Sequence, residues 1–184
     1  ETAFPATTPP ETRFRCLYSR GTGYKNTGQL DRAESEFRRM IDSIADDDAI
    51  SEDARMELRA LALTGVGEVA TNRGDYDAAE DQMREALELY RRIDDRYGQA
   101  HCLDRLGRIA GERGEFDQLD RYCDDAAAIA DELGATRIRC RLQNSRGLAA
   151  WTRGDLEAAE SYFLDSLEHG RSMDSRQDEA FALG

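Results

Sequence analysis

Residues able to carry out chemistry are few in this 184-residue chain, and their spacing fits no reactive site. His101 and His169 lack the second histidine, four residues on, that a zinc-binding HExxH helix supplies. No G-x-S-x-G stretch occurs in the sequence. The acidic stretch 46–53 lacks the glycine that a calcium loop needs at its sixth position. We therefore predict a protein that is not an enzyme, with no metal site and no cofactor.

The stretch GTGYKNTGQL, residues 21–30, places a lysine among three glycines and so suggests a phosphate-binding loop. Such a loop needs lysine and then serine or threonine directly after its last glycine, because these side chains reach the terminal phosphates and the magnesium ion. Gln29 and Leu30 occupy those places after Gly28, and Lys25 precedes that glycine. We therefore expect the glycines to serve the fold rather than a nucleotide.

The same stretch is the first of four copies of one pattern. In each copy a glycine precedes a second glycine by seven residues, and the register recurs after 46, 40 and 40 residues. The pairs are Gly21 and Gly28, Gly67 and Gly74, Gly107 and Gly114, and Gly147 and Gly154. Apolar or small residues follow the second glycine at fixed distances of two, five and nine residues. Recurrence at a fixed period is the signature of a helical-repeat architecture.

The two glycines of each pair have different predicted roles. The second glycine precedes a new apolar period, as is typical of a left-handed glycine that ends a helix, so it separates helix A from helix B of a hairpin. The first glycine lies inside helix A, where it costs about 1 kcal/mol relative to alanine. We expect close approach of the neighbouring helix to be the reason, because a Cβ atom would obstruct it.

These residues resemble the tetratricopeptide repeat (TPR) family. The pattern is carried in the second copy by Leu63, Val66, Gly67, Ala70, Gly74, Tyr76, Ala79, Met83 and Ala86, and in the third by Leu103, Leu106, Gly107, Ala110, Gly114, Phe116 and Ala126. The resemblance implies an all-α fold, a right-handed α-α superhelix (solenoid) of helical hairpins, and it implies binding of partner peptides or helices in a concave groove lined by the A helices.

The chain departs from the family pattern in three respects. Its period of 40 exceeds the usual period of about 34 residues and is similar to a variant with longer helices. The proline that usually closes helix B is absent. Arg20 and Arg146 stand where the middle copies have Val66 and Leu106, so the packing there is expected to differ.

The predicted domain organisation follows from these copies. Residues 1–11 hold all three prolines and form a flexible lead-in rich in proline and threonine. Residues 12–184 form the TPR-like array, with hairpins at about 12–46, 52–93, 96–133 and 135–173, and with the start of a fifth helix pair at 175–184. Because that last stretch matches only the beginning of an A helix, we expect these residues to be part of a longer protein.

Composition limits the possible partners. The net charge of −13 opposes phosphate backbones, so direct nucleic-acid binding is not expected. No apolar run reaches the length of a membrane span. The four cysteines lie beside apolar residues and are expected to be buried, reduced thiols in a cytoplasmic protein. The arginine-rich, acidic balance suggests a GC-rich genome and a salt-adapted organism.

Helical spacing predicts which side chains face the groove, in one stripe per A helix. The stripes are Arg15, Tyr18, Thr22, Lys25 and Asn26; Leu61, Thr64, Glu68, Thr71 and Asn72; His101, Asp104, Arg105, Arg108 and Glu112; and Arg141, Asn144, Leu148, Trp151 and Thr152. Five of these residues are cationic and three are acidic, so the groove carries +2 while the rest of the chain carries −15. Such a groove would attract acidic segments.

Our hypothesis is that Arg105, Arg108, Arg141, Asn144 and Trp151 hold an acidic or carboxylate-bearing partner peptide. The alternative is that these arginines pair with Asp104, Glu112 and their neighbours inside the array. Two further alternatives concern the whole chain: it is an effector-sensing segment of a larger signalling or transcription-regulating protein, or it self-associates into a homo-oligomer through its exposed end helices.

Overall fold

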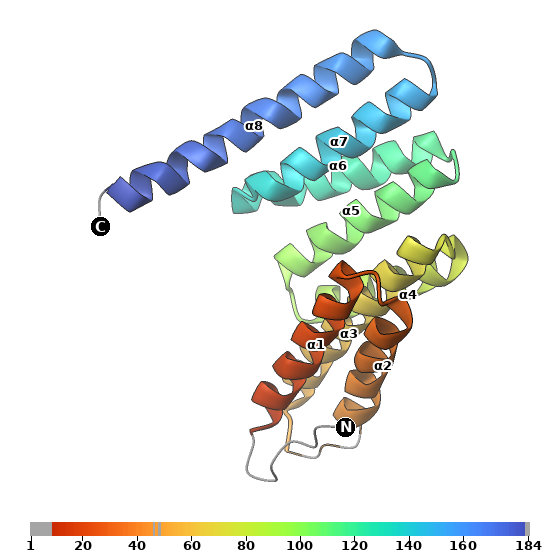
Figure 1. The fold of residues 1–184 in the computed structure, drawn as a ribbon, viewed down its shortest axis with the longest axis vertical. Helices are drawn as coiled ribbons and strands as arrows, with labels where there is room; N and C mark the ends of the chain where they lie inside the picture. The colour runs from red at the N-terminus through yellow and green to blue at the C-terminus, as the bar shows by residue number, and fades with distance from the viewer. Residues whose placement is uncertain (1–8, 46, 48, 183–184) are drawn as a thin grey trace. The chain divides into compact units, whose positions relative to one another are not determined.

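The computed structural model describes residues 9–45, 47 and 49–182, with side chains up to Arg171. Its described residues form eight α-helices and no strand (Figure 1). The helices are α1 (Pro10–Asn26), α2 (Leu30–Ala45), α3 (Glu52–Arg73), α4 (Tyr76–Arg92), α5 (Arg96–Glu112), α6 (Phe116–Leu133), α7 (Thr136–Thr152) and α8 (Leu156–Ala182). The predicted all-α fold of helical hairpins is confirmed.

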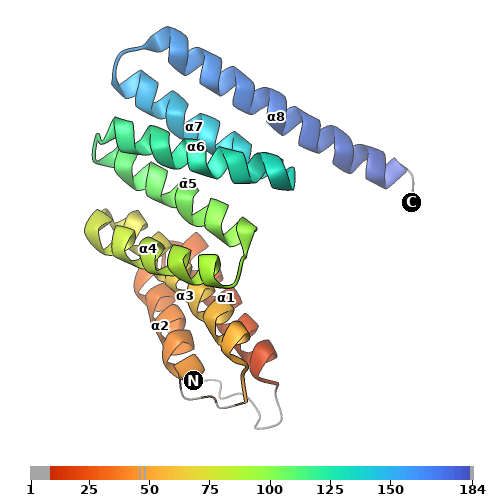
Figure 2. The ribbon, with the colours of Figure 1, turned by 180° about the vertical axis from the view of Figure 1, so that it is seen from behind.

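The chain divides into two compact units. Unit 1, Glu1–Asp95, contains α1 to α4, and unit 2, Arg96–Gly184, contains α5 to α8. In each unit every helix packs on the next one along the chain, and the two A helices (α1 with α3, α5 with α7) also touch. Figure 2 shows α7 and α8 side by side from behind. The odd-numbered helices are therefore the A helices, and the even-numbered ones are the B helices.

The four predicted turn glycines are all left-handed. Gly28, Gly74, Gly114 and Gly154 have φ between +75° and +82°. In each turn the backbone N–H after the glycine donates to the carbonyl five residues back in the A helix, as from Asp75 to Ala70 at 3.0 Å and from Asp155 to Ala150 at 3.0 Å. This pattern satisfies the last carbonyls of the helix, so the predicted role of the second glycine is confirmed.

The first glycine of each pair faces helix B of its own hairpin. A Cβ atom on Gly21 would lie 2.6 Å from the Phe37 ring, and one on Gly147 would lie 2.7 Å from the Phe163 ring. At Gly67 the nearest atom would be Cε of Met83, at 2.9 Å. At Gly107 the nearest would be 3.4 Å away, an ordinary contact. The expected close approach is confirmed, and it is tight in three of the four hairpins.

Two clusters of buried residues in unit 1 join α3 to the preceding hairpin. Phe37, Ala33, Val66 and Val69 form one of them. Phe14, Leu17, Met40, Ile44, Leu58 and Ala62 form the other. An A helix thus packs against its own B helix on one side and against the preceding B helix on the other.

The C-terminal helix differs from expectation. We predicted a break near residues 173–175 and the start of a fifth helix pair, but α8 continues unbroken from Leu156 to Ala182. The reason is local, because no glycine or proline lies between residues 171 and 183 to stop the helix. Residues 183–184 lie outside the described residues. So do residues 1–8 of the expected lead-in, while Pro10 already belongs to α1, in the first helical turn that proline tolerates.

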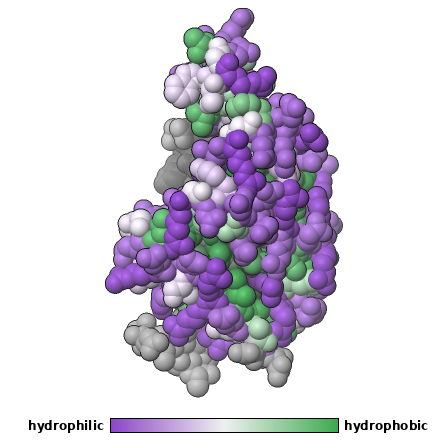
Figure 3. Space-filling model, turned by 90° about the vertical axis from the view of Figure 1, so that its right-hand side faces the viewer, coloured by the Kyte–Doolittle hydropathy of each residue, from purple (hydrophilic) through white to green (hydrophobic). Residues whose placement is uncertain are grey.

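The surface is largely hydrophilic. Figure 3 shows one face on which hydrophobic residues appear as separate spots between charged and polar side chains. Within the described residues, no helix is both long and apolar enough to cross a membrane.

Candidate functional site

In unit 1, most of the predicted groove residues have partners inside the fold. Lys25 of α1 forms an ion pair with Glu68 of α3, and both side chains are largely buried. This pair joins the two A helices directly. Because Glu68 is 11% exposed and takes the positive charge of Lys25, neither side chain is freely offered to a ligand.

The other candidates of unit 1 are divided between core and surface. Tyr18 packs against the core, with its ring centroid 5.6 Å from that of Phe37. Thr64 is buried, and its hydroxyl donates to the Ala60 carbonyl at 2.9 Å. The exposed candidates are Arg15, Asn26 and Asn72. The half-buried ones are Thr22 and Leu61, and Thr71 is buried.

In unit 2, the predicted cations surround a buried carboxylate. The Asp104 side chain is 4% exposed, and its Oδ2 lies 3.0 Å from Nε of Arg141 and 4.0 Å from Nε of Arg105. The first contact joins α5 to α7. For Arg105 and Arg141, internal pairing with Asp104 is what the structure shows. His101 and Arg108 are half-buried on the same helix as Asp104, and Glu112 is exposed.

The C-terminal half of α7 carries an exposed stripe. Asn144, Leu148 and Trp151 follow one another at helical spacing and continue the line of Arg141. Leu148 is 48% exposed and Trp151, the only tryptophan of the chain, is 60% exposed. Thr152 is also exposed, and its hydroxyl donates to the Leu148 carbonyl at 2.8 Å. Large apolar side chains on a surface are typical of contact sites.

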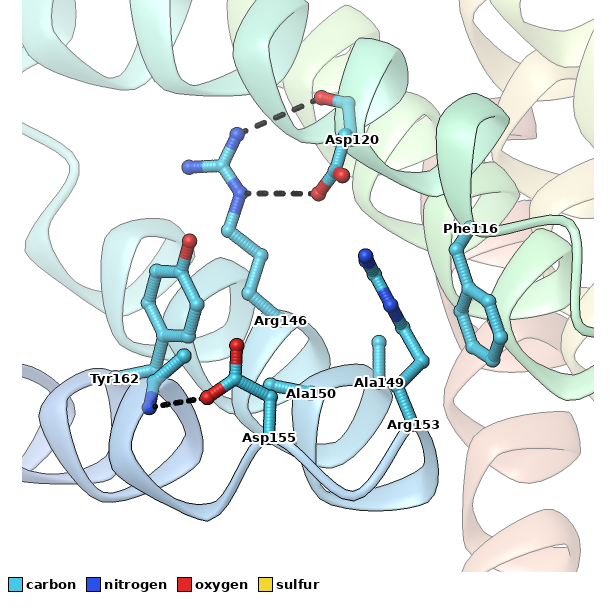
Figure 4. Close-up of a pocket in the computed structure, with 9 residues that line it drawn as sticks. Phe116, Asp120, Arg146, Ala149, Ala150, Arg153, Asp155 and Tyr162 are labelled. Carbon is cyan, nitrogen blue, oxygen red and sulfur yellow. Dashed lines mark hydrogen bonds and ion pairs between the residues drawn. The ribbon is translucent and has the colours of Figure 1, made fainter.

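Arg146, one of the departures from the family pattern, has a definite role in packing. Its Nη2 lies 2.5 Å from Oδ1 of Asp124, and its Nε lies 3.8 Å from Oδ1 of Asp120. Both acidic residues belong to α6, so Arg146 ties the A helix α7 to the preceding B helix. Figure 4 shows its contact with Asp120. The charge replaces the apolar contact that Val66 makes in α3.

A small pocket lies beside this ion pair. Its volume is about 120 Å³, and it is lined by Phe116, Arg146, Arg153, Asp155 and Tyr162 among others (Figure 4). The Arg153 guanidinium lies over the Phe116 ring, 5.6 Å from its centroid. Pockets for cofactors and drug-sized ligands are usually several times larger. The pocket therefore fits the packing of three helices better than the binding of a small molecule.

The structure offers little reactive chemistry. Among the described residues no group of three His, Cys, Asp or Glu side chains could hold a metal ion. All four cysteines lie in described segments and are free thiols, with Cys102 and Cys123 buried, Cys140 half-buried and Cys16 exposed. Burial raises the pKa of Cys123 to about 12, so this thiol is protonated at neutral pH. The prediction that the cysteines are buried is therefore wrong for Cys16.

The apolar side chains of α8 were not among the predicted site residues. Leu156, Leu164 and Leu167 are 57–65% exposed, and Phe163 is 38% exposed. The repeat register could have indicated Leu156, Phe163 and Leu167, because the equivalent positions of α2 pack against the next helix.

Comparisons with known proteins identify the repeat. The tetratricopeptide repeat family model matches residues 58–118. No curated protein sequence matches the chain.

Solved structures share the fold over most of the chain. The structure of BtubC (BKLC) from P. vanneervenii aligns with 92% of this chain and 68% of its own, at 17% identity and a TM-score of 0.72. The Rap conjugation gene regulator of the plasmid pLS20, in complex with the Phr* peptide, aligns with 92% of this chain at 18% identity and a TM-score of 0.75. The present chain spans 48% of that regulator. MamA aligns with 88% of this chain and 81% of its own, at 20% identity and a TM-score of 0.58.

The family match covers the second hairpin and the start of the third, and the structural matches extend the fold to almost the whole chain. Residues 58–118 therefore match the tetratricopeptide repeat family, and the chain shares a helical-repeat fold with these solved structures.

Proposed function

We propose that this chain is a non-catalytic interaction module that binds a peptide or helix of a partner protein on the A-helix face of unit 2. Proteins with this fold generally mediate protein–protein interaction. The observation that carries the proposal is the stripe Arg141, Asn144, Leu148 and Trp151 on α7, which places an exposed tryptophan and leucine beside a cationic cluster.

The apolar part of the stripe supplies the anchor. Tryptophan and arginine are the residue types most often found at binding hot spots, because they bury large areas and make directed contacts. Trp151 and Leu148 lie on adjacent turns of α7, so one apolar side chain of a partner can contact both.

The charged part of the stripe favours an acidic partner. Helix α7 contains four arginines and no acidic residue. Asp104 neutralises part of the positive charge of Arg105 and Arg141. A partner carboxylate would therefore share these two arginines with Asp104. Arg108 adds a further positive charge on α5. A carboxylate near Arg108, with an apolar residue on Trp151, is the ligand that this face fits best.

A titration with labelled peptides tests the proposal. Peptides selected against the chain from a random display library are measured by fluorescence anisotropy, next to versions with Asp and Glu replaced by Asn and Gln. We expect Trp151→Ala to weaken binding by about 2 kcal/mol, roughly thirty-fold. We expect Arg108→Ala, and the neutralised peptides, to bind about ten-fold more weakly.

The matched control is Arg121→Ala, because Arg121 is an exposed arginine on the B helix α6 of the same unit. It should leave the affinity unchanged, and circular dichroism should show equal helix content in all variants. Selected peptides that bind Trp151→Ala and Arg108→Ala as tightly as the unaltered chain would place the binding surface elsewhere.

A second candidate is an effector-sensing segment of a larger regulator. It is supported by the likeness to the Rap regulator, whose structure contains a bound peptide. In that case peptide binding should change the arrangement of the two units, which small-angle X-ray scattering with and without a selected peptide would detect. An unchanged scattering profile would favour a plain scaffold.

The cellular setting is also part of the proposal. Free thiols at all four cysteines support a cytoplasmic location, because disulfides are rare in that compartment. The high density of surface carboxylates supports a salt-adapted host.

A further inference from the structure

The outer face of α8 carries large apolar side chains at positions where α2 packs against the following helix. In α2, Leu30, Phe37 and Ile41 pack against the cluster that includes Val66 and Val69 of the following helix, α3. The residues at the same distances from the turn glycine in α8 are Leu156, Phe163 and Leu167. Phe37 is 1% exposed whereas Phe163 is 38% exposed, and the two leucines are 65% and 57% exposed. The face of α8 thus matches a face that another helix buries.

The same comparison indicates the charge of a helix that would cover this face of α8. Six residues after the turn glycine, α2 has Glu34, α6 has Asp120 and α8 has Glu160. Glu34 pairs with Arg73 of α3, and Asp120 lies 3.8 Å from Arg146 of α7. In both cases an arginine from the following A helix meets this carboxylate. A helix that covers α8 should therefore bring an arginine to Glu160.

The contact between α6 and α7 shows how strong this charge pattern is. Helix α6 contains six acidic residues and one arginine, whereas α7 contains four arginines and no acidic residue. Helix α8 continues the acidic character, with four acidic residues against Arg171 among residues 156–171. A basic A helix is the partner that the repeat provides for an acidic B helix.

Helix α1 has the free face that would fit. In α3, Ala62, Val66 and Val69 are the residues that pack on the preceding B helix. The equivalent residues of α1 are Cys16, Arg20 and Gly23; Cys16 and Gly23 are exposed, and a Cβ atom on Gly23 would find open space. Arg20 has the register of Arg146; it is half-buried and paired with Glu36 of α2, so a carboxylate of another copy would share it with Glu36. Helix α1 contains four cationic residues and one acidic residue, so its charge complements that of α8.

Small residues on α1 also meet the steric requirement. The Phe37 ring lies so close to Gly65 of α3 that a Cβ atom there would be 2.7 Å away. The equivalent residue of α1 is Ser19, which is exposed and is one of the smallest side chains. Phe163, which is only partly buried, can therefore be accommodated by α1 of another molecule.

We infer that copies of this chain associate head to tail, with the outer face of α8 (Leu156, Glu160, Phe163, Leu164 and Leu167) packed against the free face of α1 (Cys16, Ser19, Arg20 and Gly23) of a second copy. A symmetric contact of two α8 helices would bring two acidic faces together, so it is disfavoured by like-charge repulsion. A head-to-tail contact uses two different surfaces, so it leaves a free end after each addition and can extend beyond a dimer.

Sedimentation velocity over a wide range of protein concentrations tests the association. Species larger than a dimer should grow with concentration. Leu167→Glu places a charge in the apolar part of the contact and should suppress this growth, lowering the association constant at least ten-fold. Ser161→Glu is the matched control, because Ser161 is exposed on α8 but lies outside the apolar face; it should leave association unchanged.

A disulfide experiment tests which surfaces meet. In α2 and α3, Ile41 packs against the cluster that contains Ala62, so the equivalent Leu167 should lie near Cys16 of the next copy. Leu167→Cys should therefore give, under mild oxidation, a ladder of linked chains joined between residues 16 and 167, as identified by peptide mass spectrometry. Adding Cys16→Ser should remove the ladder.

Two results would overturn the inference. One is a monomer at every concentration; the other is a dimer whose cross-link persists in Cys16→Ser with Leu167→Cys, which would show that two α8 helices meet. The inference is independent of peptide binding by unit 2, because Leu167→Glu leaves Trp151 and Arg108 intact and should bind selected peptides normally.

Discussion

Gly21 and Gly107 have the same position in the repeat, yet the space around them differs. The Phe37 ring fills the space beside Gly21 and is enclosed on its other side by Gly65, so it cannot move away from an added methyl group. Beside Gly107 the nearest atoms are Cβ of Tyr122 at 3.4 Å and Sγ of Cys123 at 3.5 Å. The glycine at this position is therefore required by packing in the first hairpin and not in the third.

Alanine substitution at these two sites should have opposite effects. Gly21→Ala should lower the free energy of unfolding by about 1–3 kcal/mol, because the buried ring must shift. Gly107→Ala should raise it by up to about 1 kcal/mol, because alanine favours the helix and meets only ordinary contacts. Urea unfolding followed by circular dichroism measures both changes. Destabilisation of equal size at the two sites would contradict the packing argument.

The glycine roles were predictable from the sequence, but the partners of the charged residues were not. The spacing assigned Lys25, Arg105 and Arg141 to the predicted groove from their positions along one helix alone. Their ion pairs with Glu68 and Asp104 depend on the distance between two A helices, which no periodicity contains. Trp151, also assigned to the groove, is exposed.

Among the elements, the turns between hairpins show what the chain requires at a helix end. Gly134 ends α6 with φ of +61°, and the residue 40 positions earlier, Asp94, follows α4 with φ of +54°. In both turns the next backbone N–H donates to the carbonyl of a residue near the end of the helix, from Asp95 to Tyr90 at 2.9 Å and from Ala135 to Ala130 at 2.8 Å. The same turn is thus built once with glycine and once with aspartate.

Exchanging these two residues should change stability in opposite directions. Asp94→Gly should raise the free energy of unfolding by about 0.5–1 kcal/mol, because a side chain with a positive φ is strained and glycine is not. Gly134→Asp should lower it by a similar amount. Thermal unfolding followed by circular dichroism detects the changes, and a lower midpoint for Asp94→Gly would show that the aspartate side chain stabilises the turn.

The helix ends were predictable wherever glycine marks them. The break expected near residues 173–175 came from aligning the last residues with an A helix, although no turn residue separates them from α8. Similarity of apolar positions alone therefore misplaced an element end, whereas the chemistry of the turn did not.

Across the whole molecule, negative charge exceeds positive charge, with 38 acidic residues against 25 basic ones. Many of the arginines are held by carboxylates of another helix, as Arg73 of α3 is by Glu34 and Asp31 of α2. Hydrogen bonds from Arg73 and then Arg38 lower the pKa of Glu34. The stability of the fold is consequently linked to the ionisation of such carboxylates.

Acid should weaken the fold in a definite window. Because the folded pKa of Glu34 lies below its ordinary value of 4.5, its contribution is present above that pH and is lost as the pH falls through the folded pKa. Glu34→Gln should remove this pH-dependent contribution to the free energy of unfolding. The urea midpoint of the variant should therefore fall less steeply than that of the unaltered chain between about pH 5 and about pH 3. The control is Glu88→Gln, since Glu88 is 65% exposed and pairs only along its own helix in the described contacts, with Arg91.

If the unfolding midpoints of Glu34→Gln and of the unaltered chain fell equally with decreasing pH, this ion pair would not contribute to the pH dependence of stability. The measurement is urea unfolding at several pH values.

The four glycine turns within the hairpins have one more consequence. Each turn glycine is exposed, with open space around it, and none of the residues proposed for binding or association lies in a turn. Exposed turns are the places where chains accept inserted segments, provided that the left-handed residue is kept. An epitope or a fluorescent label inserted directly after Gly74 or Gly114 can therefore report on the protein in a cell while leaving its contact surfaces undisturbed.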